Sequence, residues 1–226
     1  MLFGELDMNS IVIAGLLYLI VFIAGILSYL PVIDDSNFLR KLHVNQRKVM
    51  FGAFSQFVLS FAYVDIAVLL YPTLRSYNEE FSLGFVSFRV IASILNILAI
   101  VIIFLLLDLS QEFSNSDSPD LLYFQTLGNL LRTGRDFLNH VAMIMALSIG
   151  GLMFYYILFQ SQLIPQCLSI WGFIGALLSI SASFLLMFKL TTIKTRLYLG
   201  LNIPMALQEI VLGIWLITIG LNPVTI

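Results

Sequence analysis

Six apolar runs, each long enough to cross a bilayer as a helix, constrain the fold of this chain more than any other feature. They cover residues 11–33, 49–71, 84–107, 137–159, 166–188 and 198–221. A hydrocarbon core of about 30 Å needs about 20 apolar residues of helix, and helices satisfy their own backbone groups in lipid. The pattern predicts an all-α integral membrane bundle of six transmembrane helices, a single domain over residues 1–226.

The composition excludes a soluble fold of this size. Hydrophobic residues make up 60% of the 226 residues and charged residues 11%, whereas a soluble domain carries about 25% charged residues. The basic residues are few and scattered over several loops, so no nucleic-acid-binding patch is expected. Membrane lipids are the expected surroundings, and the sequence does not say whether the protein has a protein partner.

The charges outside the runs predict how the chain lies in the membrane. The first ten residues hold Glu5 and Asp7 and no basic residue, unlike a signal peptide, so we expect the first run to remain as a span. Nine basic residues lie in the first, third and fifth connections, and only Arg75 lies on the opposite side. Because basic residues near span ends stay cytoplasmic, we expect both termini to face outward.

The third connection contains a predicted helix of its own, in the stretch SDSPDLLYFQTLGNLLRTG. Ser118 is the expected N-cap and Gly134 the expected stop. Four apolar residues share one helical face: Tyr123, Leu127, Leu130 and Leu131. We therefore expect a short interfacial helix between spans three and four.

Three ionisable residues lie within the predicted spans, where charge is costly and usually faces the bundle interior. They are Asp65, Arg89 and Glu209. Asp65 precedes Tyr71 by six residues and Arg89 follows Gly84 by five, so both sit roughly 8–10 Å from the same surface at about 1.5 Å per residue. We predict that Asp65 and Arg89 form an ion pair.

Glu209 lies nearer the middle of the membrane, at the expected depth of Asn96. Polar stripes at helical spacing run along both spans: Arg89, Ser93 and Asn96 on span three, and Asn202, Ala206, Glu209 and Gly213 on span six. We expect these stripes to face each other or to share a cavity. Without a cation at its depth, Glu209 is expected to carry a proton.

Small residues predict a tight hairpin of spans four and five. They are Ala142, Ala146 and Gly150 on the fourth span, and Gly172, Ala176, Ser179 and Ser183 on the fifth. Small side chains let helix backbones approach closely in a membrane.

Three stretches resemble a known family: YPTLRSYNEEFSLGFVSFRVI, YYILFQSQLIPQCLSIWGFIGALL and NIPMALQEIVLGIWLITIG. They carry a tyrosine-proline exit from a span, an arginine in the next span, a proline turn before a tryptophan-glycine pair, and a glutamate before a tryptophan. The residues at these places are Tyr71, Pro72, Arg89, Pro165, Trp171, Gly172, Glu209 and Trp215. From about Gly15 onward the chain resembles the bacterial domain-of-unknown-function family 4386. The resemblance implies a multi-pass protein of the bacterial cytoplasmic membrane and brings no activity.

The sequence offers little support for catalysis. The single cysteine, Cys167, excludes an intramolecular disulfide and a cysteine-based zinc site. His43 and His140 lie near the cytoplasmic surface, and His140 is expected to bond lipid headgroups or Asp136. Nucleotide-binding and hydrolase motifs do not occur. We therefore expect no catalytic residue, no metal and no cofactor. An enzyme is less favoured than a protein without catalytic activity.

Three functions stay open. The first is a buried ionisable site, opening outward, that binds or moves a small molecule, ion or proton; its residues are Asp65, Arg89, Asn96 and Glu209. The alternative is a non-catalytic membrane subunit or stress-associated protein that acts through a partner or lipid, in which buried charges only fix helix register. The third is a lipid-modifying enzyme.

Overall fold

The computed structural model describes residues 8–116 and 120–221, and within these ranges it is helical with no strand. The elements are α1 (Met8–Leu27), η1 (Pro31–Asp34), α2 (Phe38–Val44), α3 (Gln46–Leu74), α4 (Glu79–Asn115), α5 (Leu121–Phe137), the π-helix η2 (Leu138–Met143), α6 (Ile144–Ser161), α7 (Gln166–Met187) and α8 (Arg196–Thr218). The expected all-α membrane bundle is confirmed.

Six helical stretches in the described ranges are long and apolar enough to cross a membrane, and they match the six predicted runs. Their ends differ from the prediction. α1 stops at Leu27 and not at residue 33, because Pro31 has no N–H to donate and disfavours helix at the preceding residue. Pro31 instead begins the short η1.

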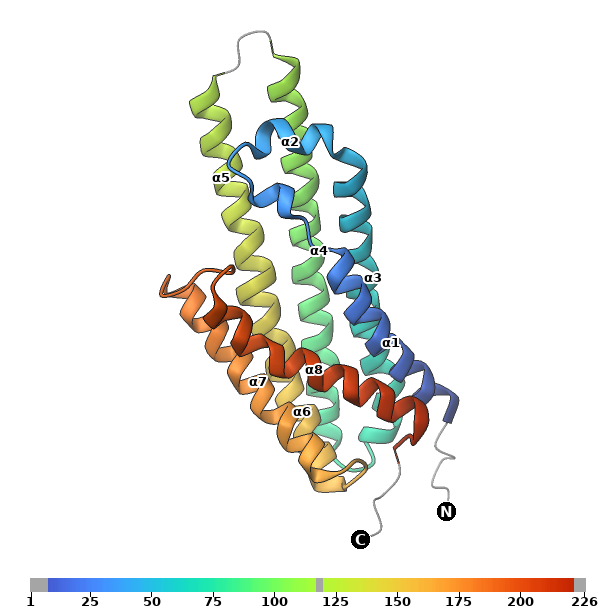
Figure 1. Cartoon of the computed structure of the whole chain (residues 1–226). Helices are drawn as coiled ribbons and strands as arrows, with labels where there is room; N and C mark the ends of the chain where they lie inside the picture. Colours follow the sequence, from blue (N-terminus) through green and yellow to red (C-terminus); the bar gives the residue numbers. More distant parts are fainter. Residues whose placement is uncertain (1–7, 117–119, 222–226) are drawn as a thin grey trace.

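The six spans form a closed ring in the order α1, α3, α4, α6, α7 and α8, with α8 returning to α1. α1 begins and α8 ends at the same end of the bundle, which also holds the α3–α4 and α6–α7 connections (Figure 1). We call this the terminal end. The opposite side, the loop end, holds η1, α2 and the α4–α5 and α7–α8 connections. The ring therefore encloses a centre into which all six spans can project side chains.

Two glycines close the ring between α1 and α8. A Cβ atom at Gly15 would lie 2.7 Å from the carbonyl oxygen of Gly213, and one at Gly213 would lie 3.1 Å from the carbonyl oxygen of Gly15. The backbones approach this closely because neither residue has a side chain. The contact fixes where the two helices cross.

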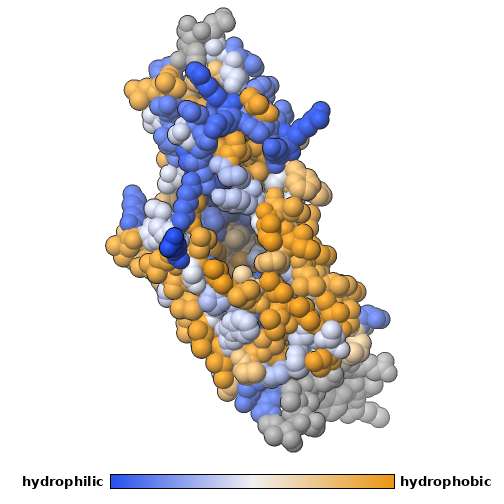
Figure 2. All heavy atoms as spheres, in the orientation of Figure 1, coloured by the Kyte–Doolittle hydropathy of each residue, from blue (hydrophilic) through white to orange (hydrophobic). Residues whose placement is uncertain are grey.

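Beyond this crossing, α1 and α8 diverge toward the loop end (Figure 1). Figure 2 shows a hollow in the surface there, between α1, η1 and the N-terminal half of α8. Between Tyr198 and Gln208, α8 has no fully buried residue. This half of α8 therefore borders the hollow on one side, while on another side Met205 packs against Gly175 of α7.

α4 is much longer than the bilayer is thick. Its 37 residues extend about 55 Å at 1.5 Å per residue, against a hydrocarbon core of about 30 Å. Its loop-end portion packs against α5 and α2 (Figure 1). There the backbone N–H of His43 donates to Ser110 Oγ at 2.9 Å, and Ser110 Oγ donates to the carbonyl of Leu39. These contacts anchor α2 on α4.

The helix expected in the third connection is present as α5, but its placement differs from the prediction. Asp120 caps it by accepting the backbone N–H of Tyr123 at 3.1 Å; Ser118, the expected cap, lies outside the described residues. α5 runs beside α4 and continues through Gly134 into η2 and α6, a single rod of 41 residues, Leu121–Ser161 (Figure 1). A glycine inside a helix costs only about 1 kcal/mol, so Gly134 does not stop it.

Candidate functional site

The side chain of Arg89 lies at the centre of the ring. It comes from α4 and is 1% exposed. The guanidinium carbon lies 4.9 Å from the ring centre of Tyr63, 5.3 Å from that of Phe85 and 6.0 Å from that of Tyr18. A cation over an aromatic face is electrostatically favourable. Aromatic side chains from α1, α3 and α4 thus enclose the cation.

Glu209 is the carboxylate partner of Arg89. Arg89 Nη2 donates to Glu209 Oε1 at 3.5 Å, and the Glu209 side chain is 17% exposed. We call these two residues the central pair. Glu209 therefore has a cation within reach, and the premise of its expected protonation, that none lies at its depth, is wrong.

The prediction of an Asp65–Arg89 pair is wrong, because Asp65 is exposed on the outside of α3. Tyr63 is the α3 residue that faces the arginine, and two residues along a helix turn the side chain by about 200°. The expectation that Glu209 lies deeper than Arg89 is also wrong, because α4 begins at Glu79. Arg89 therefore lies about 15 Å from that end of its helix, at nearly the depth of Glu209.

Asn96 takes part in a different contact. Its Nδ2 donates to the carbonyl of Gln56 at 3.1 Å and to Ser60 Oγ at 2.8 Å. One turn away, Ser93 Oγ donates to the Ser60 carbonyl at 2.9 Å. These bonds hold α4 against α3, so the two predicted polar stripes do not meet along their length. Ala206, a member of the α8 stripe, is exposed.

Two polar residues that sequence reasoning missed complete the centre. Tyr155 Oη on α6 donates to Gln208 Oε1 at 2.6 Å. Gln208 Nε2 donates to the carbonyl of Leu168 on α7 at 3.3 Å. The available signal was the pair of adjacent polar residues, Gln208 and Glu209, in an otherwise apolar span. With these contacts every span of the ring contributes to the centre.

Several hydrogen-bond donors at the centre lack an acceptor in the described part of the chain. Arg89 Nε, Arg89 Nη1 and Tyr18 Oη are buried without a hydrogen-bond partner in the described part of the chain. Buried polar atoms nearly always have a partner, and an unpaired one costs about 1–3 kcal/mol. A guanidinium can only donate. The arrangement therefore suits a group that brings acceptor oxygens to Arg89.

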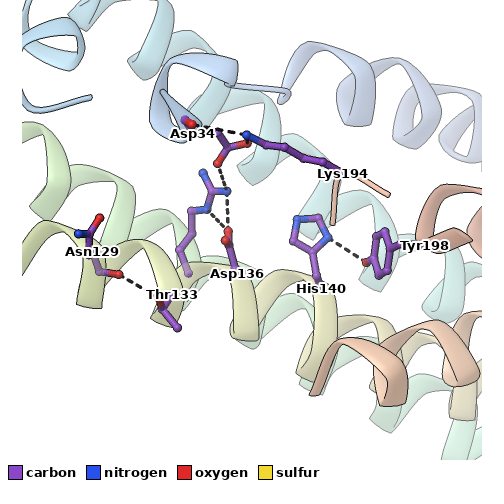
Figure 3. Close-up of polar contacts among 8 residues, drawn as sticks. Asp34, Asn129, Thr133, Asp136, His140, Lys194 and Tyr198 are labelled. Atoms are coloured by element: carbon purple, nitrogen blue, oxygen red, sulfur yellow. Dashed lines mark hydrogen bonds and ion pairs between the residues drawn. The ribbon is translucent and has the colours of Figure 1, made fainter. Parts of the chain in front are cut away.

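A second polar group lies at the loop end beside the hollow (Figure 3). We call it the rim cluster; it consists of Asp34, Arg135, Asp136, His140, Lys194 and Tyr198. Arg135 Nη2 lies 2.6 Å from Asp136 Oδ1 and 3.5 Å from Asp34 Oδ1. Lys194 Nζ lies 3.8 Å from Asp34 Oδ2. These charges balance one another and join η1, the end of α5 and the connection before α8.

His140 belongs to the π-helix η2 and faces α8. Its Nδ1 lies 3.1 Å from Tyr198 Oη, and Ser183 Oγ donates to its backbone carbonyl at 3.1 Å. Its ring partner is thus Tyr198 and not Asp136, which binds Arg135 (Figure 3). Single π turns often occur at functional sites, and this one holds the start of α8 against the rod.

One face of α8 links the rim cluster to the central pair. Tyr198, Asn202, Met205 and Glu209 follow one another at helical spacing. Glu209 lies 11 residues beyond Tyr198, a distance of about 17 Å along the helix. The hollow lies beside the N-terminal half of α8 (Figure 2).

Asp35 follows η1 at the surface, outside the spans. The Lys41 ammonium and the backbone N–H of Asn37 donate to its carboxylate, and these bonds hold the pKa of the Asp35 carboxyl below its usual range. The pair supports the turn that leads into α2.

Neither an apolar cavity nor a metal site competes with the central pair as the candidate site. A cavity of about 300 Å³ lies between α6 and α7, but no charged side chain lines it. No group of three or more His, Cys, Asp or Glu residues within the described ranges is placed to hold a metal ion.

Comparison with known proteins identifies a family. A family model with the description "Domain of unknown function (DUF4386)" matches residues 13–220. No curated protein and no solved structure matches the chain.

Proposed function

The chain belongs to the family described as a domain of unknown function (DUF4386), and on that premise we propose that it binds a small molecule or ion at the central pair. The Arg89 side chain carries this proposal: it is 1% exposed, its contact to Glu209 is long, and two of its nitrogens have no hydrogen-bond partner among residues 8–116 and 120–221. Ionisable groups at membrane depth are typical of ligand and ion pathways.

The hollow supports the proposal because it gives a ligand an approach to the bundle from the loop end (Figure 2). The inner face of α8 continues from the N-terminal half of the helix past Asn202 toward Glu209, which is the more exposed member of the central pair. A ligand would meet this carboxylate before it met the buried arginine. This approach is from the side opposite to the one expected from sequence.

We further infer that the protein resides in a bacterial cytoplasmic membrane with both termini outside. The nine basic residues of the first, third and fifth connections lie toward the loop end, whereas Arg75 lies at the terminal end. Because basic residues near span ends stay cytoplasmic, the hollow and the rim cluster would face the cytoplasm.

The test compares the wild type with the neutral pair Arg89→Gln/Glu209→Gln, in which neither charge is left alone. Native mass spectrometry of protein purified in detergent should find a bound small molecule or ion that the wild type retains and the neutral pair loses. Asp65→Asn, a change on the outer face of α3, should retain it. A neutral pair that folds and retains every bound species would favour the alternative, a non-catalytic subunit acting through a partner or lipid.

A further inference from the structure

We propose that the central pair binds a small monocarboxylate together with one proton. The ligand carboxylate replaces that of Glu209 at Arg89, and Glu209 takes up the proton. The inference rests on the proposed function and names the ligand of that same site.

The unpartnered atoms at the centre determine the charge of the ligand. Arg89 Nε and Nη1 and Tyr18 Oη are all able to donate, and the guanidinium has no acceptor. A cation would be repelled by Arg89, and a neutral apolar ligand would leave the donors unpaired. A carboxylate supplies two acceptor oxygens that match the fork of a guanidinium. The site therefore fits a carboxylate.

The geometry of the central pair allows Glu209 to be replaced. Its contact with Arg89 is 3.5 Å, which is longer than the roughly 2.7–2.9 Å typical of charge-assisted hydrogen bonds. The Glu209 side chain is 17% exposed while that of Arg89 is 1% exposed. Tyr63 and Phe85 enclose the guanidinium, so it cannot follow Glu209 outward. Glu209 can withdraw while Arg89 stays in place.

The charges around Glu209 require the proton. The titratable groups near it are Arg89 on α4 and the hydroxyls of Tyr18 on α1, Tyr63 on α3 and Tyr155 on α6. α7 carries no charged side chain between its first and last residues, Gln166–Met187. Among the residues that the structure describes, the centre therefore holds one positive and one negative charge.

A second carboxylate would leave one negative charge without a counter-charge. An unpaired ionised carboxylate is strongly disfavoured away from water, and it takes up a proton instead. The charges at the centre then balance: a carboxylate and a proton enter from solution, Arg89 pairs with the ligand, and Glu209 becomes neutral. No covalent bond other than the new O–H forms.

The experiment is calorimetric titration of the full chain in detergent with acetate, and with chloride as a comparison. Titrations in two buffers of different ionisation enthalpy, at about pH 6 and about pH 8 where acetate is anionic, give the protons taken up per anion. The wild type should take up about one proton per acetate, and acetate affinity should fall about tenfold per pH unit as pH rises. Chloride, which has no forked oxygens, should bind more weakly.

Two variants and one control make the result decisive. Glu209→Gln, which is neutral at every pH, should bind acetate without proton uptake and without pH dependence. Arg89→Gln/Glu209→Gln should not bind it, and Asp65→Asn should behave as the wild type. Acetate binding by the wild type without proton uptake would overturn this inference and leave the proposed function standing. If acetate does not bind, this inference is wrong. The proposed function then still stands if native mass spectrometry finds a species that the wild type retains and the neutral pair loses, and it fails if no such species is found.

Discussion

Arg89 Nη2 and Glu209 Oε1 lie 3.5 Å apart although 120 residues separate them. Their helices are not neighbours in the ring, because α4 packs between α3 and α6 while α8 packs between α7 and α1. The contact therefore crosses the centre of the bundle. It links the two halves of the ring through their interior.

This pairing predicts non-additive effects on stability. Arg89→Gln leaves Glu209 without its cation, and Glu209→Gln leaves Arg89 without its carboxylate; each should cost about 3–5 kcal/mol, the typical cost of breaking a buried pair from one side. The double variant should lose less than the sum. Denaturant unfolding in detergent measures all three. Losses that simply add would show that the two side chains do not interact.

Asp65 provides the contrasting case. It lies on the exposed face of α3 with Phe61 and Val68, so its removal leaves Arg89 and Glu209 undisturbed. We expect Asp65→Asn to lower the free energy of unfolding by less than about 0.5 kcal/mol, because no buried contact is lost. The same unfolding experiment measures this change. A loss of unfolding free energy as large as that of Arg89→Gln would support the Asp65–Arg89 pair instead.

The α1–α8 crossing should tolerate no added side chain. In Gly15→Ala the new Cβ would lie 2.7 Å from the carbonyl oxygen of Gly213, a backbone atom that cannot move aside alone, so we expect a loss of about 1–3 kcal/mol. Gly200→Ala is the matched control on α8, because nothing lies within 4 Å of its Cβ position. That change should stabilise the helix by about 0.5–1 kcal/mol. Equal effects of the two changes would mean that the backbones are not in contact.

The rim cluster should limit access to the hollow. Asp34→Asn weakens the contacts of η1 with Arg135 and Lys194, so a cysteine placed at Asn202 should react faster with a thiol reagent, in a chain whose Cys167 is replaced by Ala. Asp35→Asn is the control, because Asp35 pairs with Lys41 and not with the rim cluster. The labelling rate decides the matter. No change with Asp34→Asn would mean that the cluster does not restrict the hollow.

The orientation is testable with two exposed serines. Ser76 lies in the α3–α4 connection and Ser114 near the loop end of α4. In the Cys167→Ala background, a cysteine at Ser76 should react with an impermeant reagent on intact cells, and one at Ser114 only after permeabilisation. The opposite pattern would place the hollow outside the cell.

The spans were predictable from sequence because apolar length alone decides them, but the direction in which each side chain points was not. The depth of Asp65 matched that of Arg89, yet the turn of α3 pointed it outward. A local signal for the depth of Arg89 was present: Asn78 accepts the backbone N–H of Phe81 at 2.9 Å and caps α4. Asn is a preferred N-cap, so this start of α4 was readable.

For the small residues, too, the sequence predicted that close helix contacts exist but not which helix each residue faces. Gly172 of α7 packs against the ring of Tyr155 on α6, as the predicted hairpin requires. Gly150, from the other predicted stripe, instead faces α4: its Cβ position lies 2.9 Å from Phe88 Cβ. A stripe identifies a close contact, but a single sequence does not say with which helix.

α4 connects the centre of the ring to the far tip of the molecule (Figure 1). From Arg89 to Asn115 the helix is unbroken, a lever of about 39 Å at 1.5 Å per residue. A tilt of about 5° pivoting at Arg89 would displace its far tip by about 3 Å over this length. The tip carries α2 and the start of α5, so a change in what Arg89 holds would be amplified into movement of the part that projects furthest from the ring.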